Sequence, residues 1–525
     1  MPSLYPHEVR KIAQGAGAAS GFAGFFFPSL RARGLGEEKP VPSYSAIVYK
    51  EGDEVRAEDW KGRKIASGEA GVDDASVIQS AINAISSRGG GEVFLKVGEY
   101  LIKEQILIDK DNIIIRGQGV DITKIIASID RPLYISASNN IVLKDFTLDG
   151  QGSTLRGIVF YSEVVARNVL IENIRTFNIK SSHILFWGTD NSLENCYTNV
   201  LIRNVECEKN PVAPSDSLVV LSIIKDAVVE NCYFHDAEGE SALSLNGQNI
   251  FVINTVVENT YGGFCIEKAD RSTRSINIIG GEARYCNYGL ELRTGRDVRV
   301  IGTRFYRNKF GVKFYDEYSH KDIRIIGCHF EEHHYPDSAN AVIQIQGTSV
   351  ENIEIKDCTF YNNCFAIGWS PAIQIRTGKR ITIVNNSVID DRDTSYTRWG
   401  VQIDNGTVED LVVARNHFVG IWDTAIGLTN SPVLINIIIK DNTPNTGKTS
   451  ASSGVATFSG DGSTTQFSIP HSLISEPSKI QVTPMTEDSA GDFYVTKDST
   501  NIYVNYLSPP PSGSNNVKLS WYAEV

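Results

Sequence analysis

The stretch at residues 323–330, with the sequence IRIIGCHF, carries a pattern that recurs through the middle of the chain. Apolar residues alternate with other residues, then a Gly, Asn or Asp follows, and a large apolar residue comes three places later. Further copies end in the same register at Phe234, Val257, Phe305, Phe360 and Phe418. Successive copies lie roughly 22 to 31 residues apart, which is the length of one solenoid coil with three short strands.

This repeat predicts an all-β fold, a right-handed parallel β-helix. β-branched and aromatic residues dominate and the alternation has a period of two, which excludes an α-solenoid. A propeller would need four strands in roughly 40 to 50 residues, and the spacing is too short for that. Equivalent residues of stacked coils form ladders along the axis, so we expect an interior aromatic stack made of Phe234, Phe305, Phe330, Phe360 and Phe418.

The cysteines indicate no metal or redox motif, because they lack C-x-x-C spacing. Cys232, Cys328 and Cys358 share one inward position of the repeat and are predicted to be buried ladder residues. Cys328 and Cys358 on neighbouring rungs would be close enough for a disulfide, but free thiols are expected. His333 and His334 are predicted to lie in a loop, and no metal site is expected.

Composition narrows the possible partners. The 525 residues carry a net charge of −12, and the sequence pI is about 5.4. An acidic chain lacks the electrostatic footprint of nucleic-acid or anionic-membrane binding. The apolar stretch at residues 13–30 is interrupted by Gly and Ser, so no membrane insertion is expected. Residues 1–42 are predicted to be a leader or anchoring segment.

The segment ahead of the coils carries a family resemblance. It contains GVDD at residues 71–74, VIQSAINA at 77–84, GGGEVFL at 89–95 and IIIRGQG at 113–119. This resembles the opening of the pectate-lyase-like β-helix superfamily, as found in phage tailspikes. The resemblance covers residues 71–443 and implies a short helix that caps the first coil, since an uncovered solenoid end is an aggregation edge.

Composition changes mark the remaining domains. Residues 43–70 are predicted to form a neck or small strand pair, and the Pro/Gly/Ser/Thr-rich residues 444–454 are predicted to form a linker. Short alternating strands separated by turns then predict a small β-sandwich at residues 455–525. It is similar to C-terminal modules of phage-type β-helix proteins, which support trimers or bind glycans.

Overlaying the later coils places polar residues in pairs on the outside of one strand per coil. Their amide, guanidinium and phenol groups form directional contacts with hydroxyls and carboxylates, so a sugar-binding face is predicted. A polar face kept only for solubility is the alternative. The pairs are Ser244 and Asn246, Cys265 and Glu267, Glu291 and Arg293, Lys313 and Tyr315, Gln344 and Gln346, Gln374 and Arg376, and Gln402 and Asp404.

Carboxylates in this set are candidate catalytic groups. Hydrolysis of a glycosidic bond uses two carboxyl groups. Glu267 and Glu291 are predicted one rung apart, near 4.8 Å at the backbone, where like charges raise one pKa. Asp316 and Glu317 are candidate partners for an inverting pair, and Asp404 is a further candidate. Ion pairs of Glu291 with Arg293, or of Glu267 with Lys313, are the structural alternative.

A lyase or an epimerase would neutralise a uronate carboxylate and abstract the adjacent proton. Arg293, Lys313, Tyr315, His320 and Arg376 are the residues whose chemistry fits. Residues 315–320, YDEYSH, faintly resemble the Tyr, Asp and His cluster of alginate epimerases, with the Asp out of place. No cofactor is expected, apart from calcium if the protein is a lyase.

Three functions remain open at this point. The leading hypothesis, from the resemblance, is a homotrimeric, tailspike-like polysaccharide depolymerase located on a virion tail or outside a cell. The second is a non-catalytic receptor-binding spike or adhesin of the same shape, and the third is a uronate epimerase. Fold alone does not choose among them.

Overall fold

The structure, a computed structural model, describes residues 44–188, 196–208, 216–267, 273–333, 341–364, 370–444 and 446–525, apart from the side chain of residue 238. The predicted leader, His334 and residue 445 of the predicted linker lie outside these ranges. The predicted parallel β-helix is confirmed: the chain forms a β-solenoid of about 12 turns, followed by a small extra sheet structure. Two compact units make up the chain, Met1–Tyr315 and Asp316–Val525.

The predicted capping helix is α3 (Asp74–Ser86). It buries Val77, Ile78, Ala81, Ile82 and Ile85, the stripe that the spacing indicated. Three antiparallel strands precede it, β1 (Ala46–Glu51), β2 (Glu54–Asp59) and β3 (Lys64–Glu69). They occupy the segment predicted as a neck, and β1 continues the first coil by pairing in parallel with β4. The open end of the solenoid is therefore covered.

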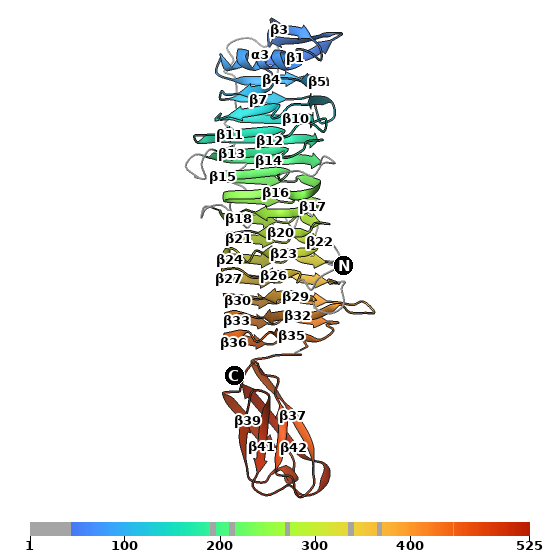
Figure 1. Cartoon of the computed structure of the whole chain (residues 1–525), viewed down its shortest axis with the longest axis vertical. Coiled ribbons are helices and arrows are strands. Elements are labelled where there is room, and N and C mark those ends of the chain that lie inside the picture. Colours follow the sequence, from blue (N-terminus) through green and yellow to red (C-terminus); the bar gives the residue numbers. More distant parts are fainter. Residues whose placement is uncertain are drawn as a thin grey trace, which may run out of the picture. The chain divides into compact units, whose positions relative to one another are not determined.

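Parallel strands of the first unit stack into three faces, which succeed one another within every coil (Figure 1). Several long strands turn a corner and contribute to two faces, and β16 contributes to all three. Face A consists of β4 (Gly91–Leu95), β7 (Ile113–Arg116), the first parts of β10 (Ile141–Asp149), β12 (Ala166–Phe177) and β14 (Tyr197–Glu208), the last parts of β15 (Val219–Glu230) and β16 (Tyr233–Ile253), β18 (Arg274–Ile279) and β21 (Gly295–Ile301).

Faces B and C complete each coil of this unit. Face B consists of β5 (Gly98–Ile102), β8 (Thr123–Ala127), the last parts of β10, β12 and β14, the first parts of β16 and β17 (Val256–Ile266), β19 (Glu282–Arg284) and β22 (Arg304–Tyr306). Face C consists of β6 (Ile106–Ile108), β9 (Leu133–Ser136), β11 (Ile158–Ser162), β13 (Ile184–Gly188), the first part of β15, the middle of β16, the last part of β17, β20 (Tyr288–Leu292) and β23 (Phe310–Phe314).

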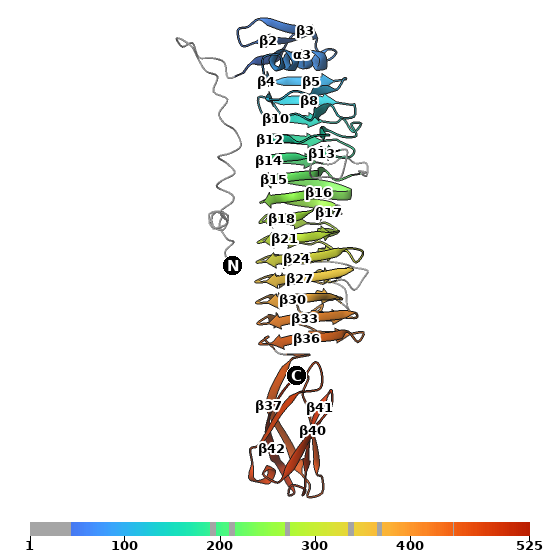
Figure 2. The ribbon, with the colours of Figure 1, turned by 90° about the vertical axis from the view of Figure 1, so that its left-hand side faces the viewer.

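The second unit repeats the arrangement in three further stacks, of which Figure 2 labels the first. The first stack is β24 (Ser319–Ile326), β27 (Ser349–Lys356), β30 (Gly378–Val384), β33 (Thr407–Ala414) and β36 (Val433–Lys440). The second is β25 (His329–Glu331), β28 (Thr359–Tyr361), β31 (Ser387–Ile389) and β34 (His417–Val419). The third is β26 (Ile343–Ile345), β29 (Ser370–Ile375), β32 (Thr397–Asp404) and β35 (Thr424–Thr429).

A small β-sandwich ends the chain, as predicted. One sheet contains β37 (Ala451–Gly460), β42 (Gly513–Glu524) and β39 (Lys479–Pro484), and the other contains β38 (Gln466–Pro470), β41 (Asn501–Tyr506) and β40 (Phe493–Lys497). A 3-10 turn, η1 (Glu487–Ser489), joins β39 to β40. Phe467, Ile469, Ile502, Val504 and Leu519 belong to the core between the sheets.

The recurring Asn, Gly or Asp of the sequence pattern has a conformational cause. These residues occupy the corner between consecutive strands with positive φ, for example 53° at Asn231, 63° at Gly302 and 55° at Asp357. Side chains other than Gly, Asn and Asp rarely adopt this left-handed region. The period of the pattern is therefore the period at which the backbone must turn.

The predicted interior ladders are confirmed in position, but the aromatic one is not continuous. All five predicted phenylalanines are buried, and the rings of Phe330 and Phe360 stack at 4.8 Å. Phe360 pairs with Val388, and Val388 pairs with Phe418. The coil between the two phenylalanines therefore places a valine at this interior position. All eight cysteines are described, all are buried, and none of them forms a disulfide.

Candidate active site

Face C presents two outward rows of side chains along the first unit. Row 1 contains, in order of pairing, Tyr134, Val159, Leu185, Val220, Ser244, Cys265, Glu291 and Lys313. Row 2 lies two residues further along each strand and contains Ser136, Tyr161, Trp187, Ser222, Asn246, Glu267, Arg293 and Tyr315. Toward the N-terminal coils the side chains of both rows are mainly aromatic or apolar. Toward the C-terminal coils of this unit they are mainly charged.

Glu291 is the deepest carboxyl group of face C. Its side chain has no exposed surface, and burial raises its pKa above the ordinary value, although the nearby Arg293 opposes the shift. It accepts hydrogen bonds from the Tyr315 hydroxyl at 3.1 Å and from Ser241 Oγ at 3.4 Å. Gly262 makes room for it, because a Cβ atom there would clash with Glu291 Oε1 and Ser241 Oγ.

Arg293 connects two rungs. Its guanidinium lies 3.2 Å from Glu267 Oε2 and 3.2 Å from Glu291 Oε2. The structure confirms the register of the overlay, with Cys265 opposite Glu291, but corrects the predicted spacing: Glu267 and Glu291 are diagonal neighbours, about 7–8 Å apart at the backbone rather than 4.8 Å. The predicted ion pair of Glu291 with Arg293 is present, and Arg293 also pairs with Glu267.

Two further carboxyl groups lie near Glu267. Burial raises the pKa of Asp216, and the negative charge of Glu267 adds to the shift. Burial also raises the pKa of Glu240, where Arg293 opposes and the charges of Asp216 and Glu267 contribute. We call Asp216, Glu240, Glu267 and Glu291, together with Arg293 and Tyr315, the acidic cluster.

The acidic cluster combines the groups that glycosidic bond hydrolysis requires. Because Glu267 and Glu291 contact one guanidinium, they lie within the roughly 9.5 Å that this reaction allows between its two carboxyl groups. Asp216 and Glu240, with raised pKa values, retain a proton to a higher pH than ordinary carboxyl groups. Such a set of carboxyls supports general acid–base chemistry.

Asp216 and Glu240 were not predicted from the sequence. Asp216 lies just before β15, and Glu240 lies at the irregular part of β16, where the pairing with β17 shifts register. The overlay of regular strands did not reach either position. The run Asp236 to Glu240, which contains three carboxylates ahead of a face C strand, is the signal that was available.

Other predicted sugar-binding residues of this unit lie beside the acidic cluster. Asn246 precedes Glu267 in row 2 and accepts a hydrogen bond from Thr273 Oγ1 at 3.2 Å. Lys313 is opposite Glu291 in row 1, and its ammonium lies 5.0 Å from the centre of the Phe310 ring. Both side chains therefore lie in the rows next to the acidic cluster.

The predicted residues of the second unit form a different structure. Gln344, Gln374 and Gln402 are buried and bonded in series, with Nε2 to Oε1 distances of 2.8 Å and 2.9 Å. Arg376 donates to Gln346 at 3.0 Å and lies 3.5 Å from the buried carboxylate of Asp404. The expectation of an open polar face is wrong here, because these amides satisfy one another. We call Gln344, Gln374 and Gln402 the glutamine ladder.

Asp316 and Glu317 are exposed in the turn that precedes β24. His320, by contrast, is fully buried. The structure therefore gives the two carboxylates of the YDEYSH segment no enclosed environment.

One group of described residues offers three possible metal ligands, Glu206, Glu208 and His235. Arg175 lies 2.8 Å from Glu208 and 3.6 Å from Glu206. Arg175 therefore already compensates the negative charge of Glu206 and Glu208, in the place where a metal ion would otherwise do so. Among the described helices, none has the length and hydropathy to cross a membrane.

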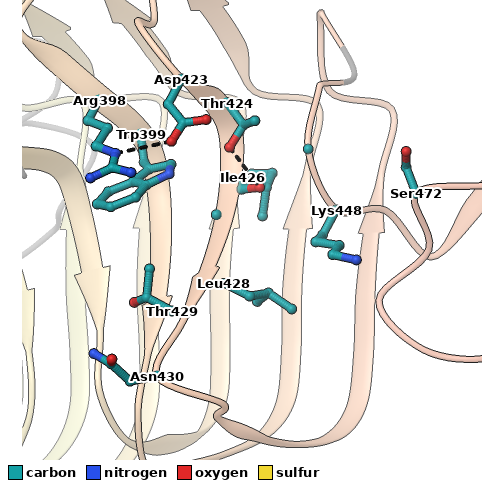
Figure 3. Close-up of a pocket in the computed structure, with 12 residues that line it drawn as sticks. Arg398, Trp399, Asp423, Thr424, Ile426, Leu428, Thr429, Asn430, Lys448 and Ser472 are labelled. Carbon is teal, nitrogen blue, oxygen red and sulfur yellow. Dashed lines mark hydrogen bonds and ion pairs between the residues drawn. The ribbon is translucent and has the colours of Figure 1, made fainter. Parts of the chain in front are cut away.

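Two of the cavities in the described part of the chain bear on the site. One, of about 430 Å³, is in the first unit and is lined by Arg156, Trp187, Asp216 and Ser222, among others. The other, of about 520 Å³, is in the second unit, where Arg398 lies over the Trp399 ring and pairs with Asp423 at 3.0 Å (Figure 3). Only the first includes a residue of the acidic cluster.

Comparison with known families identifies the same fold. The family model for rhamnogalacturonase A and epimerase, pectate-lyase-like, matches residues 66–291. Mannuronan C5-epimerase AlgE1 of Azotobacter vinelandii is 27% identical over 194 residues, which are 33% of this chain and 13% of that protein. AlgE5 of the same organism is 24% identical over 45% of this chain and 25% of its own length. The chain thus matches a quarter or less of these curated relatives.

Solved structures agree on the architecture. A double mutant of the tailspike protein of E. coli bacteriophage HK620, in complex with a pentasaccharide, superposes with a TM-score of 0.55. That match is 13% identical and covers 88% of this chain and 91% of the tailspike. Gene product 12 of bacteriophage phi29 matches with a TM-score of 0.50, at 15% identity, over 69% of this chain and 54% of that protein.

Proposed function

We propose, for a chain that belongs to the pectate-lyase-like parallel β-helix superfamily, that it is a tailspike-like enzyme that cuts a surface polysaccharide at the acidic cluster. One observation supports this most directly. Asp216, with a raised pKa, lines a cavity of face C and lies within the electrostatic reach of Glu267, a carboxylate ion-paired with Arg293. Neighbouring carboxyls with different environments are the arrangement of glycoside hydrolases.

In this proposal Asp216 is the general acid and Glu267 the general base. Asp216 donates its proton to the glycosidic oxygen as the bond to the anomeric carbon breaks. Glu267 accepts a proton from the water whose oxygen forms the new bond to that carbon. Glu291 is a positioning residue because it pairs with the guanidinium that orients Glu267, and Tyr315 is another because its hydroxyl donates to Glu291.

A lyase or epimerase is the second candidate. The curated relatives are mannuronan C5-epimerases, and the family model names an epimerase beside a rhamnogalacturonase, so the comparisons support an epimerase in part. Both reactions need a cation to neutralise the uronate carboxylate. Arg293 is the cation of the acidic cluster, but two protein carboxylates already contact it. Hydrolysis therefore uses the observed charges with less rearrangement. We propose no cofactor for hydrolysis, and calcium only for the lyase alternative.

An assay of products separates these reactions. Purified protein is incubated with bacterial surface polysaccharides and with mannuronan. Hydrolysis releases reducing ends without ultraviolet absorbance, lysis produces the absorbance of unsaturated uronates, and epimerisation changes sugar composition without shortening the chain. Binding without any of these products would contradict the proposal and favour a receptor-binding spike or adhesin.

The assembly and location that accompany this proposal are a homotrimer on a virion tail or outside a cell. The tailspike-like architecture and the C-terminal sandwich support both. Sedimentation equilibrium of the full chain tests the trimer, and a monomer mass at micromolar concentration would contradict it.

A further inference from the structure

Three aromatic side chains stand on the outside of face C, at the opposite end of the rows from Glu291. The rings of Tyr134 and Tyr161 stack at 6.3 Å, and Tyr161 meets Trp187 edge-on at 6.0 Å. They come from the successive strands β9, β11 and β13. The side chain of Trp187 is 47% exposed. We call Tyr134, Tyr161 and Trp187 the aromatic tract.

The aromatic tract rests on a small apolar bed outside the solenoid core. Val159, Leu185 and Val220 form a separate buried cluster, and Tyr134 packs against it. These residues alternate with interior residues such as Phe160 and Phe186, whose rings stack at 4.3 Å inside the coil. The cluster supports the Tyr134 ring, on which the Tyr161 ring stacks, while the fold does not require the exposed indole of Trp187.

Polar groups border the aromatic tract on the side of the acidic cluster. The cavity of about 430 Å³ is lined by Trp187, Arg156, Ser222 and Asp216. Arg156 is held in place by Asp130, at 2.7 Å. An aromatic face beside fixed hydroxyl, guanidinium and carboxyl groups suits a pyranose ring, which has an apolar face and a rim of hydroxyls.

The register connects the two regions. Strands β13, β15, β16 and β17 pair in sequence on face C, so Trp187 and Glu267 are three rungs apart, about 14 Å along the stack. Row 2 continues between them through Ser222 and Asn246, whose side chains form hydrogen bonds. One extended ligand lying along the rows would contact both regions.

We infer that the aromatic tract is a second part of the glycan-binding site, which stacks against pyranose rings and lays the polysaccharide along face C toward the acidic cluster. This inference rests on the proposed function for its ligand class. It identifies the ligand as a chain of several sugars with at least one apolar ring face, and it assigns binding to Trp187 separately from catalysis by Glu267.

Affinity electrophoresis tests the inference. The variant Glu267→Gln, which cannot turn over the ligand, migrates through gels that contain each bacterial surface polysaccharide or mannuronan. Adding Trp187→Ala should weaken retardation about tenfold, since the ring no longer buries apolar sugar surface. Trp187→Phe should retain most of the retardation. Trp60→Ala is the matched control, because Trp60 is 43% exposed and lies between β2 and β3.

The outcomes separate this inference from the proposed function. Equal retardation with and without Trp187→Ala would overturn the inference that the aromatic tract binds the glycan. This holds even if Glu267→Gln abolishes cutting of the same polysaccharide, which would support the proposed enzyme. If Trp187→Ala weakens retardation but the wild-type protein cuts none of the polysaccharides, the inferred role of the aromatic tract in binding would stand. The proposed enzymatic function would then be overturned. Retardation by none of the polysaccharides would overturn both.

Discussion

The acidic cluster of the first unit and the glutamine ladder of the second arise from the same sequence pattern, yet they differ in chemistry. Both lie on the outside of the third strand of successive coils. In the glutamine ladder every amide donates to the next, with Gln402 ending on Thr429 at 2.9 Å. In the acidic cluster two of the four carboxyl groups, Glu267 and Glu291, contact the one guanidinium of Arg293, and burial raises the pKa of the other two, Asp216 and Glu240.

This difference indicates where function is to be sought in a solenoid. Amide side chains both donate and accept, so they form closed chains along the axis that stabilise the stack. Carboxylates only accept, and placing several together is unfavourable unless a ligand or a reaction uses them. The following predictions test that distinction.

The largest expected effect is on catalysis. Glu267→Gln should reduce the release of reducing ends by about 10²–10⁴-fold, because a general base is lost. The matched control is Glu172→Gln on face A, where the carboxylate accepts from Arg203 at 2.6 Å in the same way. A comparable loss of activity in the control would show that breaking any ion pair between neighbouring coils reduces activity. It would contradict the assignment of Glu267 as the general base.

Gly262→Ala should lower activity about tenfold or more, because the new Cβ displaces the carboxyl group of Glu291 and with it the support of Arg293. Initial rates and thermal unfolding are measured together. Gly491→Ala is the control, since its Cβ would meet only the Tyr506 ring at 3.4 Å. Full activity of the Gly262 variant would exclude a role for Glu291 in positioning.

Gln374→Ala should break the glutamine ladder and lower the free energy of unfolding by about 1–3 kcal/mol for each buried amide left unpaired. Gln466→Ala, on the exposed surface of the sandwich, should change stability little. Differential scanning calorimetry compares the two. Equal unfolding temperatures would mean that the ladder contributes nothing to the second unit.

The smallest expected effect is a shift in pH dependence. Asp216 acts as an acid only while protonated, so activity is retained below its raised pKa and lost as pH rises through it. Arg156 opposes this raised pKa, so Arg156→Gln should move the alkaline limb of the rate profile to higher pH. Arg203→Gln, on face A, should leave it in place. A shift to lower pH would contradict the assignment of Asp216.

Much of the fold followed from the sequence. The spacing of residues such as Asn231, Gly302 and Asp357 revealed the coil length, because each marks a corner where the backbone requires positive φ. The stripe on residues 77–85 revealed the capping helix in the same way. Both features depend on residues that are close together in the chain, so they can be recognised from the sequence alone.

The candidate site was only partly visible. Glu267, Glu291 and Arg293 belong to regular strands and could be overlaid, whereas Asp216 and Glu240 lie where the strand pattern is irregular. The burial of Gln344 and Gln374 was missed for another reason. Alternation shows which way a side chain points, but not whether other atoms cover it.

The sequence by itself determined the period, the three-stranded coil, the cap and the identity of the residues along each row. Only the tertiary structure decided which rows are open, which carboxyls share Arg293 and which amides bond to one another. The physical reason is that solenoid contacts join residues about one coil apart. Within one register a side chain can bond to a diagonal neighbour, as Arg293 does to Glu267 and Glu291, and the pattern of the sequence does not show which of these contacts forms.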